Sequence, residues 1–102
     1  MLQRRKPEDG APTITVTIEI TVVNQLGIHA RPAAAFVKLA NKFQSDITIE
    51  KDGEQVNGKS IMGLLMLGAA QGSKLKVIAT GHDAETAIRE IEELFARKFD
   101  EN

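Results

Sequence analysis

His29, Arg31 and Ser60 are the side chains whose types and positions best suit chemistry in this sequence. His29 and Arg31 lie two residues apart in the stretch GIHARP, residues 27–32, where the helical spacing of apolar residues begins. The second histidine, His82, lies in a turn, and we expect a plain surface residue because no metal-binding side chains are spaced around it. The chain has no cysteine, which excludes a thiolate metal site and thiol chemistry.

The place of His29 at the start of a helix favours phosphate chemistry. The first turn of a helix carries unpaired N–H groups and the positive end of the helix dipole, which stabilise an anion by roughly 0.3 to 1 kcal/mol. Arg31 adds a planar guanidinium that pairs with two phosphate oxygens. A neutral imidazole nitrogen is a nucleophile, so His29 could accept a phosphoryl group held by Arg31 and by the amides of Ala30 and Arg31. The simpler alternative is that His29 is an N-cap and Arg31 a solvated first-turn residue.

Composition limits the class of protein. The chain has 102 residues, enough for one domain but not for a second core. Lys plus Arg count 13 and Asp plus Glu 14, and this balance argues against a nucleic-acid binder. No apolar run approaches the roughly 18 residues of a membrane span, so we expect no membrane insertion. The charged start, with no apolar segment behind it, predicts a cytoplasmic protein.

The first residues differ in character from the rest of the chain. Residues 1–12 combine prolines with charged side chains and predict a flexible N-terminal tail. Arg4, Arg5 and Lys6 in this tail either touch an acidic partner or form a solvated terminus. Residues 13–102 are expected to form the folded domain.

Hydrophobic periodicity predicts seven elements in the order βαββαβα. Asp52 and Gly53 favour a tight hairpin between two short strands. Ser60 is placed to cap a helix that Gly72 ends, and Asp83 to cap the last helix. The pattern predicts an α+β open-faced sandwich, a four-stranded antiparallel sheet covered on one side by three amphipathic helices. The expected strands cover residues 13–22, 47–51, 54–57 and 74–79, and the expected helices begin near residues 30, 61 and 84.

Two alternative functions fit parts of this pattern. Residues 53–60 satisfy the P-loop pattern GxxxxGK[ST], which would make the chain a nucleotide-binding module. Against this, the first glycine belongs to the expected hairpin and the next residues alternate as a strand. An RNA-binding module with this element order would carry aromatic residues on the open sheet face. All four aromatic residues instead fall on or near helices: Phe36, Phe43, Phe95 and Phe99.

The stretch GIHARPA, residues 27–33, closely resembles the active-site signature of the HPr family, the histidine-containing phosphocarriers of the bacterial phosphotransferase system. The resemblance continues through NGKSIMGLL, residues 57–65, and covers roughly residues 13–99. It implies the HPr fold, in agreement with the expected element order. It also implies a monomeric carrier that needs no metal or cofactor and has no turnover alone.

The resemblance further implies a relay of phosphate between proteins. Enzyme I would pass phosphate from phosphoenolpyruvate to Nδ1 of His29, which would hand it to an enzyme IIA component while Arg31 steadies the group. Exposed Ile61 and Met62 would form a small apolar patch able to adapt to several partners. The family's docking surface maps onto six residues of two helices: Ala30, Ala34, Lys38, Ile61, Met62 and Leu65.

Ser60 matches the position that an HPr serine kinase phosphorylates in some members of the family. A phosphate there would place nearly two negative charges beside the docking surface, whereas the alternative is that Ser60 is only an N-cap. The branch of the family stays open, because the stretch NQLG, residues 24–27 with Leu26 before the glycine, and the ending FDEN, residues 99–102, resemble the nitrogen-regulatory paralogue. The segment after Ser60 instead resembles the sugar-transport branch. A mainly regulatory paralogue acting through protein contacts is therefore an alternative to sugar transport.

Overall fold

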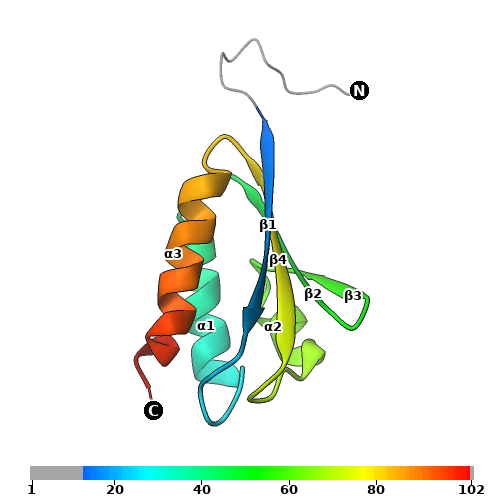
Figure 1. The fold of residues 1–102 in the computed structure, drawn as a ribbon, viewed down its shortest axis with the longest axis vertical. Helices are drawn as coiled ribbons and strands as arrows, with labels where there is room; N and C mark the ends of the chain where they lie inside the picture. Colours follow the sequence, from blue (N-terminus) through cyan, green and yellow to red (C-terminus); the bar gives the residue numbers. More distant parts are fainter. Residues whose placement is uncertain (1–12, 102) are drawn as a thin grey trace.

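Residues 13–101 are described by a computed structural model, in which one sheet carries three helices (Figure 1). The expected tail, residues 1–12, lies outside the described residues, as does residue 102. The sheet order is β1-β4-β2-β3, and each neighbouring pair of strands is antiparallel. The strands are β1 (Ile14–Thr21), β2 (Asp46–Lys51), β3 (Glu54–Asn57) and β4 (Lys74–Gly81). The helices are α1 (Ala30–Ala40), α2 (Ile61–Leu67), α3 (Ala84–Ala96) and the short 3-10 helix η2 (Lys98–Asp100).

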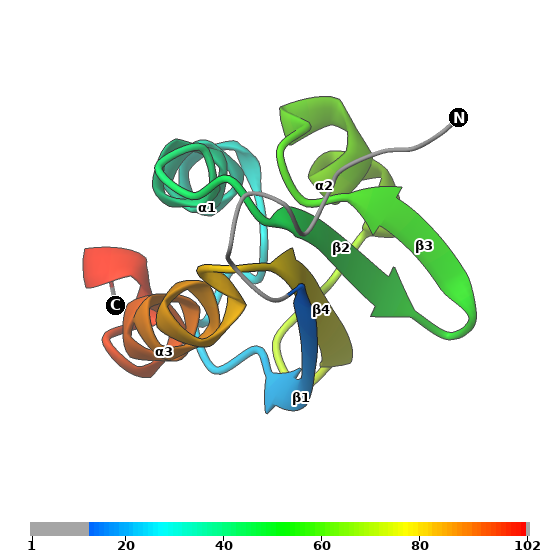
Figure 2. The ribbon, with the colours of Figure 1, turned by 90° about the horizontal axis from the view of Figure 1, so that it is seen from above.

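All three helices lie on one face of the sheet, as the view along the strands shows (Figure 2). The sheet presents alternate side chains to this face, since Ile18 of β1 pairs with Val77 of β4, and Val77 in turn pairs with Ile49 of β2. Phe36 of α1 meets Phe95 of α3 edge to face, with ring centroids 6.2 Å apart. The α+β open-faced sandwich expected from the sequence is therefore confirmed.

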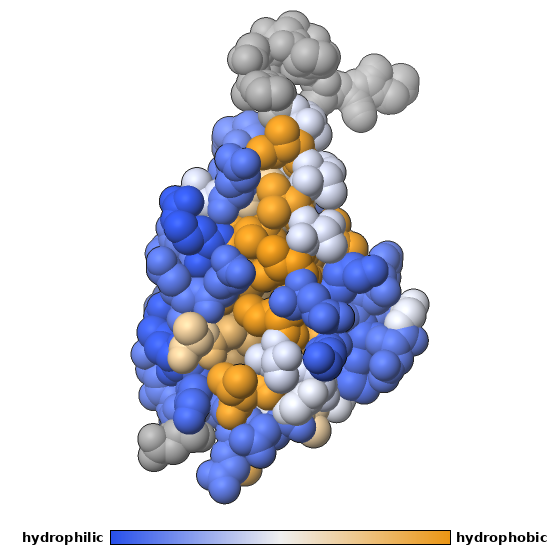
Figure 3. All heavy atoms as spheres, viewed as in Figure 1, coloured by the Kyte–Doolittle hydropathy of each residue, from blue (hydrophilic) through white to orange (hydrophobic). Residues whose placement is uncertain are grey.

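The apolar face of β1 is only half covered because β1 is an edge strand. Figure 3 shows apolar side chains along the seam between α3 and β1. Four residues of β1 pack against the core while staying partly accessible: Ile14, Val16, Ile18 and Ile20. Within the described residues, no helix is both long and apolar enough to cross a membrane.

The local signals of the sequence were correct in part. Asp52 and Gly53 both have positive φ, 52° and 84°, as the expected hairpin requires. The end of α2 was predicted wrongly, because the helix stops at Leu67 and Gly68, with φ 62°, forms the left-handed C-cap that we had assigned to Gly72. Gly72 instead serves the next turn, where its N–H donates to the carbonyl of Val22.

The expected cap of α3 was also wrong in its contacts. Asp83 occupies the N-cap position, but its side chain makes no hydrogen bond to that helix. Its carboxylate instead accepts from the N–H of Gln44 and from the N–H and hydroxyl of Ser45. Because these donors lie between α1 and β2, Asp83 ties the start of α3 to a loop far away in the sequence.

Candidate phosphate-accepting site

The chain enters α1 through a loop whose path is fixed by close backbone contacts. Gly27 has φ 70°, and a Cβ atom there would lie 2.5 Å from the carbonyl oxygen of Ala69. The next residue, Ile28, donates its N–H to the same oxygen at 2.8 Å. His29 follows as the N-cap residue of α1 in an extended conformation. The loop therefore sets the position of His29 against the end of α2.

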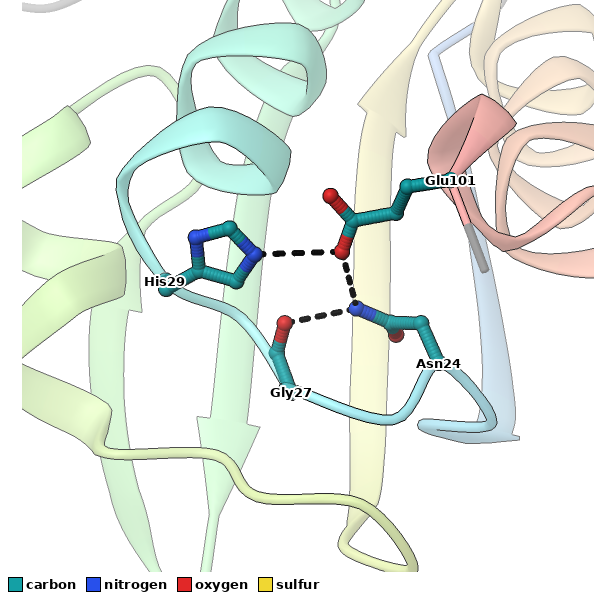
Figure 4. A network of polar contacts seen from close by, with 4 residues as sticks. All are labelled: Asn24, Gly27, His29 and Glu101. Carbon is teal, nitrogen blue, oxygen red and sulfur yellow. Dashed lines mark hydrogen bonds and ion pairs between the residues drawn. The ribbon is translucent and has the colours of Figure 1, made fainter.

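The imidazole of His29 lies at the N-terminal end of α1 (Figure 4). As an N-cap residue it makes no side-chain hydrogen bond to the helix, although its carbonyl accepts from Ala33 at 3.0 Å. Its Nε2 lies 3.1 Å from Oε1 of Glu101, and the side chain is 37% exposed. Within the described part of the chain Nδ1 makes no hydrogen bond, and Figure 4 shows it on the side of the ring away from Glu101.

A buried amide holds Glu101 beside the ring. Asn24, 0% exposed, donates from Nδ2 to Oε1 of Glu101 at 3.1 Å and to the carbonyl of Gly27 at 2.6 Å (Figure 4). Partial desolvation raises the pKa of Glu101, but the hydrogen bonds from His29 and Asn24 and the nearby charge of Arg31 outweigh it, so the pKa is lower than usual. Glu101 is therefore an ionised carboxylate at neutral pH.

A left-handed turn after α3 brings Glu101 back to the loop before α1. Lys98, Phe99 and Asp100 all have positive φ, between 55° and 61°. Such a conformation costs a residue other than glycine about 1–2 kcal/mol. Phe99 is buried and meets Phe95 with ring centroids 4.8 Å apart, while Arg97 pairs with Asp100 at 3.1 Å. The packed phenylalanine and the ion pair offset the strain and fix the direction of the turn.

The first turn of α1 leaves donors free on the exposed side. The N–H groups of Ala30 and Arg31 have no hydrogen-bond partner among residues 13–101. Ala30 and Arg31 are exposed, and Arg31 is close enough to Glu101 for its charge to lower the pKa of that carboxyl. The structure therefore brings a half-exposed imidazole, two backbone donors and a guanidinium to the N-terminal end of one helix.

The N-terminus of α2 carries Ser60 and an apolar surface. The hydroxyl of Ser60 accepts from the N–H of Gly63 at 3.0 Å, which is the cap expected from the sequence. Met62 is 68% exposed, and Ile61, Leu65 and Met66 are exposed as well. Ala34 and Lys38 lie exposed along α1, the helix that packs beside α2. Met66 is an exposed apolar residue that our sequence analysis did not include.

Two contacts of the site region were missed from the sequence. Lys59 donates from Nζ to the carbonyl of Phe43 at 2.7 Å. Asn24 and Glu101 are 77 residues apart, and we had used the segments that contain them only to compare branches of a family. Neither segment carries a periodic pattern, so only the folded chain brings these residues together. His82 is exposed, as expected.

The fold and the site together define a small α+β protein built around one accessible imidazole at a helix N-terminus. The family model described as "PTS HPr component phosphorylation site" matches residues 16–97. The chain is 45% identical over 84 residues to the phosphocarrier protein HPr of Xylella fastidiosa, covering 82% of this chain and 94% of that protein. It therefore belongs to the HPr family and is a phosphocarrier protein of the phosphotransferase system, not a standalone enzyme.

Other relatives agree with this placement. A crystal structure of HPr from Thermoanaerobacter tengcongensis superimposes with a TM-score of 0.82 at 47% identity, covering 85% of this chain and 98% of that chain. The HPr-like protein Crh of Bacillus subtilis is 45% identical over 73 residues, which cover 72% of this chain and 86% of Crh. The chain is thus similar both to HPr and to an HPr-like protein.

Proposed function

We propose that His29 accepts a phosphoryl group on Nδ1 from phosphorylated enzyme I and passes it to an enzyme IIA component. The observation that supports this proposal is that the two nitrogens of the His29 ring have different surroundings. Nε2 is engaged by Glu101 at 3.1 Å, whereas Nδ1 makes no hydrogen bond within the described residues and the side chain is 37% exposed. A partner protein can therefore reach the free nitrogen.

The bonds that form and break in the proposed transfer involve only the ring of His29 and a phosphorylated imidazole of enzyme I. The lone pair of Nδ1 attacks phosphorus, a new N–P bond forms, and the N–P bond of the donor breaks with its electron pair returning to the donor nitrogen. The N–H groups of Ala30 and Arg31, together with the guanidinium of Arg31, donate to the phosphoryl oxygens. Because this cradle is open to solvent, it holds the group without trapping it.

We place the docking surface on the exposed sides of α1 and α2. Ile61, Met62 and Leu65 supply apolar contact area, and methionine adapts to partners of different shape. Ala30, Ala34 and Lys38 extend the same surface along α1. A surface of this kind suits two successive partners because it does not depend on a single rigid pocket. The proposed relay runs in the cytoplasm, where its ultimate donor, phosphoenolpyruvate, is made.

We propose a second, regulatory function for Ser60 as the substrate of an HPr serine kinase. Its half-buried hydroxyl caps α2, so a phosphate attached there would meet the N-terminal end of that helix. The two added charges would lie next to exposed Ile61 and Met62. The similarity to Crh, which a solved structure names a catabolite repression HPr, also favours a regulatory role beside transport. We also propose that the chain acts as a monomer. Light scattering should give the mass of one chain.

The primary function is tested with labelled phosphoenolpyruvate, magnesium and enzyme I. The intact protein and the control His82→Ala should each incorporate one acid-labile phosphoryl group per chain. His29→Ala should incorporate none while keeping the same circular dichroism spectrum. Equal labelling of His29→Ala and the intact protein would overturn the proposal.

A further inference from the structure

We propose that Glu101 is a positioning residue that keeps the proton of the His29 ring on Nε2, with Asn24 and the left-handed turn at residues 98–100 holding the carboxylate in place. This inference rests on the function proposed above and deepens it. It assigns to the end of the chain a part in presenting Nδ1 to the donor. It also gives a reason for the buried amide of Asn24 and for the left-handed turn at residues 98–100, which both surround Glu101.

The hydrogen bond to Glu101 fixes the tautomer of the His29 ring. An ionised carboxylate only accepts hydrogen bonds, so a contact of 3.1 Å between Oε1 of Glu101 and Nε2 of His29 requires the hydrogen to be on Nε2. In a neutral imidazole the other nitrogen is then unprotonated. Nδ1 consequently carries its lone pair on the side of the ring away from Glu101 (Figure 4).

The amide of Asn24 has a single orientation that satisfies its neighbours. Its Nδ2 donates to the carbonyl of Gly27 and to Oε1 of Glu101, both of which are acceptors. A flipped amide would direct Oδ1 at these two acceptors and lose both bonds. In the observed orientation Oδ1 is buried with no partner among the described residues, which is unfavourable for a polar atom. The Asn24 amide therefore leaves Oδ1 without a hydrogen bond among the described residues, while Nδ2 donates to both Gly27 and Glu101.

The C-terminal turn is equally specific in direction. Three successive residues hold positive φ, and the N–H of Glu101 donates to the carbonyl of Lys98 at 2.9 Å. Buried Phe99 anchors the turn on Phe95. Glu101 has a side chain only 13% exposed, although it lies next to the last residue of the chain. Strain of this kind clusters at functional sites, where the surrounding structure enforces it.

A fixed proton on Nε2 also affects the phosphorylated ring. When Nδ1 forms its bond to phosphorus and Nε2 keeps its hydrogen, the ring carries a positive charge that the carboxylate of Glu101 stabilises. When an acceptor nitrogen attacks phosphorus, the N–P bond electrons return to Nδ1 and the ring leaves as neutral imidazole. The charged side chains beside the ring are Glu101 on the C-terminal turn and Arg31 on α1. Glu101 thereby keeps the phosphoryl group transferable.

Two variants of Glu101 separate the effect of its hydrogen bond from the effect of its charge, and a third variant is the control. Glu101→Gln keeps an acceptor for Nε2 but removes the charge, and Glu101→Ala removes both. Glu93→Gln is the matched control, because Glu93 is an exposed carboxylate of α3 that lies outside the turn at residues 98–100. Amide spectra establish that each variant is folded.

Nitrogen-15 NMR of the ring, before and after phosphorylation, tests the inference. In the free protein we expect the Nε2–H tautomer in the intact chain, Glu93→Gln and Glu101→Gln, and a larger share of Nδ1–H in Glu101→Ala. In the phosphorylated protein the pH midpoint for loss of the Nε2 proton should fall by about one unit in both Glu101 variants. Tautomers and midpoints unchanged in Glu101→Ala would overturn the inference. An intact protein that takes no phosphate would refute the proposed function alone, because the free-ring measurement would still test Glu101.

Discussion

His29 and Glu101 are 72 residues apart in the chain, yet Nε2 of one lies 3.1 Å from Oε1 of the other. The contact joins the N-terminus of α1 to the turn that follows α3. It engages one ring nitrogen and leaves the other free on the side of the ring away from Glu101 (Figure 4). A phosphocarrier needs such asymmetry because only one nitrogen is to receive the phosphoryl group.

Arg31 is expected to affect the rate of transfer and not the fold. Arg31→Ala should slow phosphorylation by enzyme I roughly 10- to 100-fold, the effect of losing a charge-assisted hydrogen bond of about 1.5–3 kcal/mol. The measurement is rapid-quench labelling at fixed enzyme I concentration. Arg89→Ala, which removes an exposed arginine from α3, is the control and should transfer at the normal rate. Equal rates for the two variants would exclude Arg31 from the site.

Ser60 offers a test of charge at the docking surface. Ser60→Asp should weaken binding to enzyme I by roughly tenfold, about 1.4 kcal/mol, because the added charge must be desolvated beside Ile61 and Met62. Aspartate is a good N-cap, so α2 should persist. Ser60→Asn is the neutral control of similar size, and binding is measured by calorimetry. If both variants bind enzyme I as tightly as the intact protein, Ser60 lies outside the interface.

The loop before His29 should not accept a side chain at Gly27. Gly27→Ala combines positive φ with a collision against Ala69, and we expect the free energy of unfolding to fall by roughly 2–4 kcal/mol. Gly72→Ala is the matched control, since φ is 91° there but no atom lies within 4 Å of the added Cβ. Its cost should be about 1–2 kcal/mol, from backbone strain alone. Urea unfolding measures both, and equal losses would show that the contact with Ala69 is not tight.

The fold was predictable from the sequence because its signals are local. Alternation along β1, the Asp52–Gly53 turn and the Ser60 cap each involve neighbours in the chain, and each is present in the structure. The end of α2 was missed because two glycines compete as helix stops and the nearer one, Gly68, adopts the left-handed conformation. Sequence alone does not rank such competitors.

Only the part of the candidate site that lies in one continuous stretch, residues 27–32, could be predicted from the sequence. The stretch from Gly27 to Pro32 contains the imidazole, the guanidinium and the free amides. Type and spacing leave open a phosphate site or a plain N-cap beside a solvated arginine, and the resemblance to the HPr family favours the phosphate site. Asn24 and Glu101 enter through contacts across the fold. The left-handed turn that directs Glu101 runs through residues other than glycine, for which the sequence gives no sign.

The lowered pKa of the Asp83 carboxyl should make the free energy of unfolding depend on pH. Desolvation raises the pKa of Asp83, but the hydrogen bonds from Ser45 and Gln44 and the charge of His82 outweigh it, so the pKa is lower in the folded protein. A lowered pKa adds stability above the unfolded value, near pH 4, and this stability disappears as the pH falls through the folded value.

The variant Asp83→Asn should therefore melt at a lower temperature than the intact protein at pH 7, and the two melting temperatures should converge below pH 4. Asp46→Asn, an exposed aspartate at the start of β2, is the control and should melt like the intact protein at both pH values. Thermal unfolding followed by circular dichroism gives the comparison. A difference between Asp83→Asn and the intact protein that persists unchanged at low pH would mean that the charge of Asp83 does not tie α3 to the loop before β2.

The most direct test of the central claim is to locate the phosphoryl group on the ring. Phosphorus-coupled nitrogen-15 NMR, after reaction with phosphoenolpyruvate, magnesium and enzyme I, identifies the nitrogen bonded to phosphorus. We predict one phosphorus coupling, to Nδ1 of His29, with Nε2 still protonated beside Glu101. A coupling to Nε2, or a phosphoryl group found on His82, would contradict the mechanism.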